Sequence, residues 1–278
     1  MFFFISGFFL KTTDNKYAFY KKRLPKLVSP YLFYTFAYLG MSILGGGSIS
    51  MRRIIYVLLL GTASTPLYYI VVLTYFTLLA PFLLKAVKRK KLSIIIIAST
   101  PVFLIFAYVI RFTGTDVWNY LKYTPVWLSF YYLGMVIKEH KPTFKKTTLM
   151  ILLLVSFITE LASTALLSNI ENFNEYTQLR FAGAFYSLIL ILLVYEYSKK
   201  KDDNCKLFTM IGDDSYAIYY MHCAFLTVFT KVIPFGDNMI LLLYQLGEIV
   251  FAVLMCELVV FILKKVIKNK KVRMIFGV

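Results

Sequence analysis

The sequence of 278 residues contains two histidines, and one of them, His222, lies inside a long apolar segment. An imidazole can take or give a proton near neutral pH, so His222 is a candidate general base. A lone histidine in an apolar segment is also commonly a packing residue, and the sequence leaves both interpretations open. The other histidine, His140, follows Lys138 and Glu139 in a basic stretch and is expected to be solvated.

Acidic residues inside apolar segments form the second set of candidates, because a carboxylate in lipid is costly and is usually retained for a function. Glu248 and Gln245, one helical turn apart, are both expected to face other helices, for function or as a hydrogen bond that fixes helix packing. Glu257 would lie about half a helical rotation from Glu248, so the two cannot form one carboxylate pair. Glu160 and Arg180 could form an ion pair on the extracellular side, with a structural role favoured over a functional one.

Cysteine spacing and charge narrow the function classes. Cys205, Cys223 and Cys256 show no CxxC spacing and no histidine cluster, so the sequence indicates buried free thiols and neither a zinc site nor a redox pair. The net charge of +17 could suggest a nucleic-acid partner. A nucleic-acid surface gathers its cations on one solvated face, whereas these cations lie at the ends of apolar segments. Membrane topology therefore explains the charge better, and no nucleic acid is expected as a partner.

The elements that must position these residues are membrane helices. Hydrophobic residues make up 59% of the chain, the mean hydropathy is +0.70, and the apolar residues occur in blocks of a length that can span a bilayer. The predicted fold is all-α: a polytopic transmembrane helix bundle, one domain over residues 1–278. The predicted spans are a partial one at 1–10 and eight complete ones at 27–45, 66–84, 92–110, 124–137, 147–168, 179–197, 216–233 and 239–263. The short span at 124–137 is expected to extend back past Pro125 toward Trp118.

Basic residues predict the orientation. The predicted loops at 11–26, 85–91, 138–146, 198–206 and 264–273 hold 25 of the 31 Lys and Arg residues, and they alternate without a break with loops that are poor in these residues. Lys and Arg are retained on the cytoplasmic side, so we expect a multi-pass protein of the cell membrane with a cytoplasmic C-terminus. The partial span at 1–10 covers only about 15 Å as a helix, about half of the bilayer, so we expect the sequence to begin inside a span.

Five segments carry a specific resemblance. They are residues 3–8 (FFISGF), 21–31 (KKRLPKLVSPY), 66–70 (PLYYI), 131–135 (YYLGM) and 212–222 (GDDSYAIYYMH). In the same order, they resemble the signature segments of the acyltransferase-3 family of polytopic membrane acyltransferases. Each match alone is weak in a chain so rich in aromatic residues, but the shared order extends over most of the sequence.

The resemblance implies an activity. Relatives in this family move an acyl group, usually acetyl or succinyl, from cytoplasmic acyl-CoA to a hydroxyl of a cell-surface or exported polysaccharide. The family's first span and half of its second have no counterpart here, and that first span carries the histidine taken as the catalytic base. The chain as given is therefore expected to be inactive without it. Lys26 replaces the second arginine of the family's RxxR element, which keeps the charge and loses the planar fork.

The resemblance also assigns roles. An acyl-CoA donor needs cations for its phosphates, and acyl transfer needs a base for the hydroxyl proton. The expected donor-binding residues are Ser6, Gly7, Lys22, Arg23 and Lys26, and the expected supporting residues are Ser215, Tyr216, Tyr68 and Glu248. His222 is the expected catalytic residue because it is the intramembrane histidine that remains, although its position in the family is more often supportive. The basic cluster could equally be a topology signal alone. No metal or cofactor is expected; acyl-CoA is a co-substrate, and the other partners are membrane lipids and the glycan acceptor.

Two alternatives stay open at this point. A transporter or flippase for a lipid-linked sugar would have broken helices near the middle of the membrane, but Pro81 lies near a span end. A non-catalytic remnant of an acyltransferase would keep the same motifs without the activity.

Overall fold

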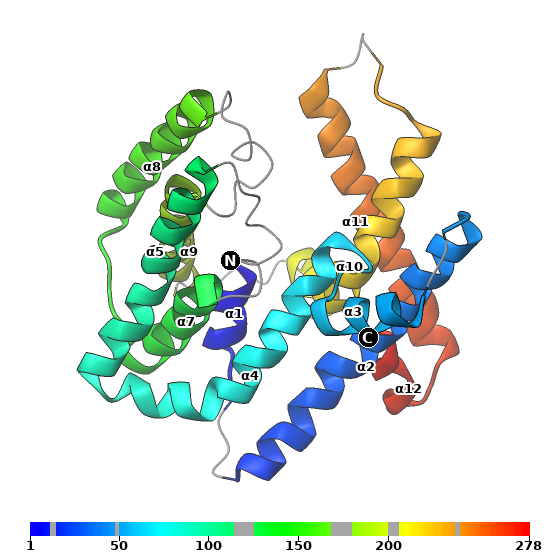
Figure 1. Cartoon of the computed structure of the whole chain (residues 1–278), viewed down its shortest axis with the longest axis horizontal. Coiled ribbons are helices and arrows are strands. Elements are labelled where there is room, and N and C mark those ends of the chain that lie inside the picture. The colour runs from blue at the N-terminus through cyan, green and yellow to red at the C-terminus, as the bar shows by residue number, and fades with distance from the viewer. Residues whose placement is uncertain (12–14, 48–49, 114–124, 168–179, 200–205, 237–239) are drawn as a thin grey trace. The chain divides into compact units, whose positions relative to one another are not determined.

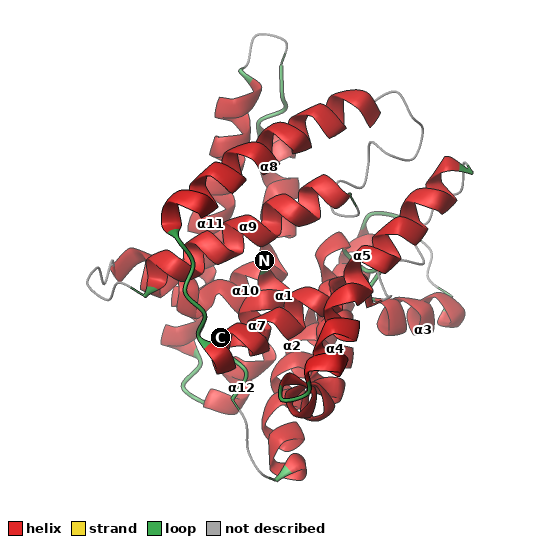
Figure 2. Cartoon of the chain, turned by 90° about the vertical axis from the view of Figure 1, so that its left-hand side faces the viewer, coloured by secondary structure: helices red, strands yellow, loops and turns green. Residues whose placement is uncertain are grey.

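The structure is a computed structural model, and it describes residues 1–11, 15–47, 50–113, 125–167, 180–199, 206–236 and 240–278. The regular elements of this part of the chain are helices (Figures 1 and 2). They are α1 (Phe2–Phe8), α2 (Lys16–Leu44), α3 (Met51–Leu60), η1 (Thr65–Leu67), α4 (Tyr68–Val87), α5 (Lys90–Phe112), η2 (Pro125–Trp127), α7 (Leu128–His140), α8 (Lys146–Leu167), α9 (Phe181–Ser198), α10 (Lys206–Val232), α11 (Leu241–Val266) and α12 (Lys270–Ile275).

The helices confirm the predicted all-α membrane class. Six of the described helical segments are long and apolar enough to cross a membrane: Lys16–Leu44, Thr65–Val87, Lys90–Ile110, Lys146–Leu167, Phe181–Ser198 and Leu241–Val266. Five of them begin and end within about three residues of predicted spans. Their apolar faces are open, as Leu154 on α8 and Leu254 on α11 show with 61% and 63% exposure. Lipid chains would cover such faces at no hydration cost.

The predicted count of eight complete spans stays a prediction. Two predicted spans, 124–137 and 216–233, correspond to α7 and α10, which are not among the six long apolar segments. α7 has 13 residues and reaches only about 20 Å, short of a bilayer core. Pro125 lies in η2 before it, and Trp118 lies outside the described residues. α10 begins at Lys206, ten residues before the predicted start at 216, and its first half carries Asp213 and Asp214.

The basic stretch 11–26 was predicted as a loop, and that prediction is wrong from Lys16 onward. α2 begins there and continues for 29 residues to Leu44, a length of about 43 Å. Lysine, leucine and alanine all favour helix, so the basic stretch before the apolar span is helical as well. The rise in hydropathy near residue 27 marks the membrane boundary and not the start of the helix.

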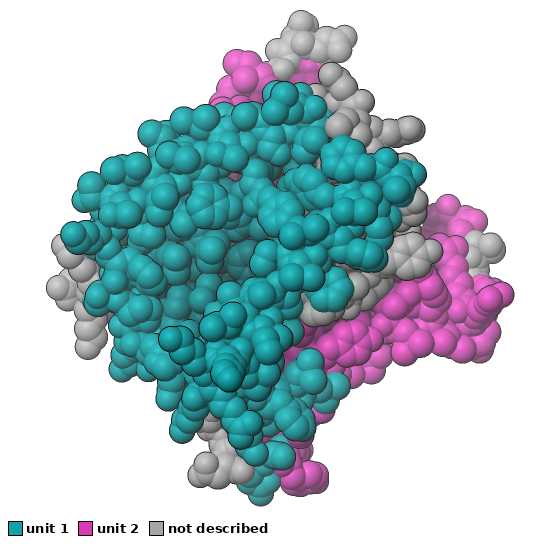
Figure 3. All heavy atoms as spheres, turned by 60° about the vertical axis from the view of Figure 1, so that its left-hand side comes forward, with its two compact units in different colours: residues 1–16, 78–202 teal, residues 17–77, 203–278 magenta. Residues whose placement is uncertain are grey.

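Two compact units make up the chain, coloured separately in Figure 3: unit 1 is Met1–Lys16 with Leu78–Asp202, and unit 2 is Tyr17–Thr77 with Asp203–Val278. In unit 1, α1 and α5 pack against α7, and α8 packs against α9. Its core includes Leu104 and Ala107 of α5 and Val126 of η2. The Ser93 and Tyr132 hydroxyls lie 2.6 Å apart and link α5 to α7. The prediction of a single domain stays a prediction.

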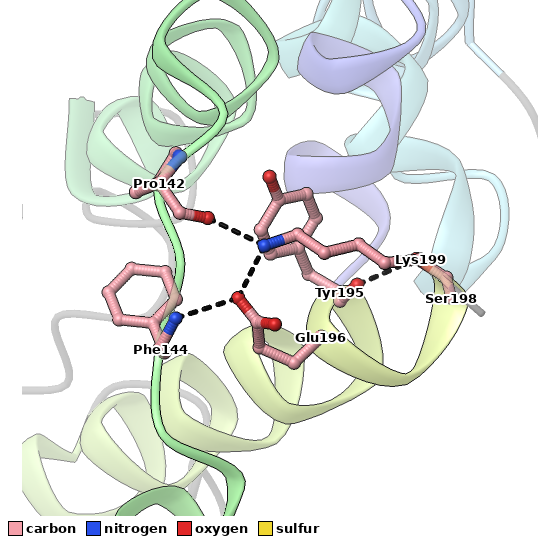
Figure 4. A network of polar contacts seen from close by, with 6 residues as sticks. All are labelled: Pro142, Phe144, Tyr195, Glu196, Ser198 and Lys199. Carbon is pink, nitrogen blue, oxygen red and sulfur yellow. Dashed lines mark hydrogen bonds and ion pairs between the residues drawn. The ribbon is translucent and has the colours of Figure 1, made fainter.

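A polar network at one end of unit 1 fixes the segment between α7 and α8 to α9 (Figure 4). Oε1 of Glu196 accepts hydrogen bonds from the Phe144 backbone N–H at 2.8 Å and from Nζ of Lys199 at 2.6 Å, and Nζ of Lys199 also donates to the Pro142 carbonyl at 2.7 Å. Burial lowers the pKa of Lys199, but its hydrogen bond to Glu196 and the nearby Tyr195 outweigh this and leave the pKa above its usual value.

Unit 2 is organised around α10, which packs along α11. Nζ of Lys264 on α11 donates to both carboxylate oxygens of Asp214 on α10, at 2.6 and 2.7 Å. Further along the same pair of helices, the Phe229 and Phe251 rings lie 5.3 Å apart. These contacts define an antiparallel register between the two helices.

Candidate active site

The residues predicted to act together fall into the two units. Unit 1 contains Ser6 and Gly7, and unit 2 contains all the others. Those others are Lys22, Arg23, Lys26, Tyr68, Ser215, Tyr216, His222 and Glu248. The geometry of each group is described within its own unit.

In unit 1, α1 and α7 cross with direct backbone contact. A Cβ added to Gly7 would overlap the Tyr131 carbonyl, and one added to Gly134 would lie 2.7 Å from the Phe8 backbone nitrogen. The two glycines belong to the first and fourth motif segments, so the structure brings these two segments together. Gly7 was predicted to contribute to donor binding; in the structure the backbone of α7 occupies the space beside its Cα.

A pocket of about 360 Å³ lies in unit 1 next to this crossing. Its lining includes three lysines and one acid: Lys85, Lys88, Lys138 and Glu139. Gly7 of the predicted donor site is also part of the lining. Nζ of Lys138 donates to the Leu10 carbonyl at 2.5 Å and so fixes the end of the α1 segment to α7. Sequence reasoning counted these lysines as topology signals only, because nothing in their spacing shows that they would share a pocket.

In unit 2, His222 is half-buried on α10, and its ring contacts indicate which nitrogen carries the hydrogen. Its Nδ1 lies 3.2 Å from the Ile218 carbonyl oxygen, which can only accept, so Nδ1 carries the hydrogen in this contact. Nε2 is then the basic nitrogen, and the Cys223 thiol lies 3.4 Å from it. An imidazole held in this way can take a proton at Nε2.

Aromatic residues of the third motif segment line the side of α10 that carries His222. The Tyr219 ring lies 5.8 Å from His222 and 5.1 Å from Tyr69, and the Tyr219 hydroxyl donates to the Pro66 carbonyl. Tyr68, the predicted supporting residue, is half-buried and lies within electrostatic range of Tyr219. The structure therefore brings residues 66–70 and 212–222 together, as the order of motifs alone could not show.

The second motif segment also reaches α10. The Tyr220 hydroxyl lies 3.3 Å from the Leu27 carbonyl, to which it donates, and the Tyr38 hydroxyl donates to the Tyr220 carbonyl at 2.8 Å. The Ser64 hydroxyl lies within hydrogen-bonding range of Tyr38 and of the Cys223 thiol. Sequence reasoning missed Tyr38 and Ser64, because hydroxyl residues are common in this chain and neither stands in a motif segment.

The basic cluster of α2 presents its charges outward. Lys22 and Lys26 are exposed and one helical turn apart, so they share a face of the helix. Arg23 is half-buried, and its guanidinium lies 5.4 Å from the centre of the Phe19 ring. This arrangement leaves the lysine ammonium groups open to an anion.

The predicted supporting residues of α10 and α11 lie away from the imidazole. Ser215 is exposed, two helical turns before His222, and its hydroxyl donates to the Gly212 carbonyl at 2.7 Å. Tyr216 packs edge-on against Tyr220, with ring centres 5.3 Å apart. In the antiparallel register of α10 and α11, the half-buried Glu248 lies beyond Phe229, about two turns from His222.

Other sequence expectations have mixed outcomes. Gln245 is exposed, so the expectation that it faces other helices is wrong.

Arg180 is buried and donates to the Thr164 hydroxyl at 3.0 Å, one turn from its expected partner Glu160. Cys223 and Cys256 are free thiols, half-buried and buried respectively, and Cys205 lies outside the described residues. Within the described ranges, no group of three His, Cys, Asp or Glu side chains could hold a metal ion.

Comparison with known proteins adds one finding. A family model described as an acyltransferase domain, that of acyltransferase-3, matches residues 1–264. No curated protein and no solved structure matches the chain. The matched range takes in all five motif segments and parts of both compact units. The chain therefore belongs to the acyltransferase-3 family of membrane acyltransferases.

Proposed function

We propose that the protein is a membrane O-acyltransferase that moves an acetyl or succinyl group from cytoplasmic acyl-CoA to a hydroxyl of a cell-surface or exported polysaccharide. The observation that carries this proposal is that motif segments 21–31 and 66–70 both contact α10, the helix that carries His222, in a chain of this family.

The proposed chemistry uses His222 as general base. Nε2 takes the proton of the acceptor hydroxyl while the hydroxyl oxygen attacks the thioester carbonyl carbon. The carbon–sulfur bond then breaks, and the thiol of CoA leaves with a proton that the imidazolium returns. The Nδ1 contact with the Ile218 carbonyl stabilises the imidazolium formed on the way, because the hydrogen on Nδ1 carries part of the positive charge. The Tyr219 ring packs beside this imidazole, with ring centres 5.8 Å apart.

The donor side of the proposal relies on charge. CoA is a polyanion that does not cross lipid, so its phosphates need cations at the cytoplasmic end of the bundle. We propose that Ser6, Gly7, Lys22, Arg23 and Lys26 contribute to donor binding. The cell membrane and a cytoplasmic C-terminus are parts of the same proposal, supported by the 25 of 31 basic residues that gather in alternate stretches of the sequence.

The test measures transfer of labelled acetyl or succinyl groups from acyl-CoA to isolated polysaccharide. It uses membranes of cells that express the chain as given, beside membranes of cells that express it joined to the first span of a family member, which is expected to be needed for activity. His222→Ala is expected to lower the rate about 10²- to 10⁴-fold, because a positioned general base contributes about that much. Thr230→Ala is the matched control, since Thr230 is exposed and two turns further along α10. Transfer by His222→Ala at the rate of the control would refute the role of His222.

A further inference from the structure

We propose that unit 1 contains a binding site for a phosphate group in the pocket where α1, α4 and α7 end. The lining of the 360 Å³ pocket has two kinds of surface. Its charged part is Lys85, Lys88, Lys138 and Glu139, and its uncharged part is Gly7, Leu10, Leu84, Val87 and Met135. The ligand class is a phosphate ester attached to an uncharged chain.

The backbone of unit 1 builds this pocket and holds one of its cations in place. Contact between Gly7 and α7 brings the end of α1 against the last turns of α7. Lys138, on the last turn of α7, donates to the carbonyl of the buried Leu10. An ammonium group has three N–H donors, so this contact fixes Nζ at the pocket wall and leaves two donors for a ligand. The cation is therefore already positioned before an anion binds.

The charge of the pocket favours an anion. Lys85 and Lys88 are three residues apart at the end of α4 and project on the same side, and Glu139 is the acid among the lining residues. Helix C-termini carry a partial negative charge of about half a unit, which the lysines of α4 and α7 exceed. Three ammonium groups and one carboxylate leave a positive surplus, and a phosphate oxygen can accept from several ammonium donors at once.

The uncharged wall limits the ligand further. Leu84, Val87 and Met135 lie beside the lysines, so a free inorganic ion would leave this surface unused. Two molecules at a membrane combine a phosphate with an uncharged chain: a CoA thioester and an anionic phospholipid. The assignment of the donor to this pocket rests on the proposed function, whereas the phosphate chemistry does not.

The experiment measures binding of coenzyme A to the purified full chain in nanodiscs of phosphatidylcholine, by calorimetry, with pantetheine as a probe that lacks phosphate. Lys85→Gln and Lys88→Gln are the variants, because both side chains are exposed and their loss leaves the Lys138 contact with Leu10 intact. Each is expected to raise the Kd for coenzyme A about five- to tenfold, as loss of one charge-assisted contact at a partly solvated site should. The Kd for pantetheine is expected to stay the same.

Two control variants separate charge from damage to the fold. Lys85→Arg keeps the charge and is expected to bind coenzyme A within about twofold of the unchanged protein. Lys265→Gln removes an exposed charge on α11, in unit 2, and is expected to have no effect. If Lys265→Gln weakened coenzyme A binding as much as Lys85→Gln does, only the net charge of the protein would matter. That result would refute the proposed site.

A second arm identifies the source of the phosphate. The same variants are purified from nanodiscs that contain about one fifth phosphatidylglycerol, and the lipid retained by the protein is measured by mass spectrometry. Loss of retained phosphatidylglycerol with unchanged coenzyme A binding would support the phosphate site and assign it to lipid. Unchanged binding of both probes would overturn it. Since neither arm contains an acceptor, failure of acyl transfer with intact coenzyme A binding would count against the proposed function alone.

Discussion

Replacement of Gly134 by alanine is expected to force α1 away from α7. The added Cβ would lie 2.7 Å from the Phe8 backbone nitrogen and 3.1 Å from the Gly7 carbonyl carbon, and it would overlap the Phe4 carbonyl. All three neighbours are backbone atoms of one short helix, so no side chain can rotate to make room. The helix itself must move, which breaks the close packing along its whole contact with α7.

Overpacking of this kind costs about 1–3 kcal/mol of the free energy of unfolding. For a chain of this size, 1 kcal/mol corresponds to a change in Tm of about 2–4 °C, so the expected fall in Tm is about 2–12 °C. Alanine also favours helix over glycine by about 1 kcal/mol, which offsets part of the cost. The net fall is therefore expected in the lower half of that range.

The assay is thermal unfolding of the full chain in nanodiscs, followed by circular dichroism. Gly40→Ala on α2 is the matched control, because a Cβ there meets no atom within 4 Å and only the gain in helix propensity remains. Its Tm is expected to stay the same or rise. A Gly134→Ala protein as stable as Gly40→Ala would refute the inference that backbone contact holds α1 against α7.

Two further predictions concern the polar links within each unit. Asp214→Asn should lower the Tm by about 2–8 °C, because it leaves the Lys264 ammonium without its carboxylate, and the double change with Lys264→Gln should recover part of the loss in the same unfolding assay. Glu196→Gln should increase amide hydrogen exchange of the Phe144 N–H several-fold, because the neutral amide is a weaker acceptor; an unchanged rate would mean that the carboxylate does not hold this segment.

The sequence was sufficient to predict the helices that cross apolar blocks. Thr65–Val87 and Lys146–Leu167 agree closely with their predicted spans, because apolar length is a local property that a single segment reveals. α3 was not predicted, although Ser50 caps its first turn by accepting from the Arg53 N–H at 3.2 Å. Its ten residues are too few to span a bilayer and too polar at the start for a hydropathy search to detect.

Contacts between segments distant in sequence were beyond sequence reasoning for a different physical reason. Gly7 and Gly134 are far apart along the chain, and each alone indicates only that some backbone approaches closely. The family resemblance gave Tyr68 and His222 roles in one reaction, but only packing shows that Tyr219 links their segments through the Pro66 carbonyl. The contacts of lysines are even harder to predict from sequence, because the long side chain places the charge several ångströms from the helix that carries it.

The residues that follow the family match pack near α10, the helix that carries His222. The match ends at residue 264, yet Tyr34 of α2, whose ring stacks on Tyr220 at 4.8 Å, donates through its hydroxyl to the Phe276 carbonyl at 3.2 Å. Gly277 has a φ of +75°, and a Cβ added there would lie 3.5 Å from the Tyr220 ring. Residues after α11 thus help to fix the tyrosine that lies two positions before His222. The limit of family resemblance is therefore not a limit of the structure that positions the candidate base.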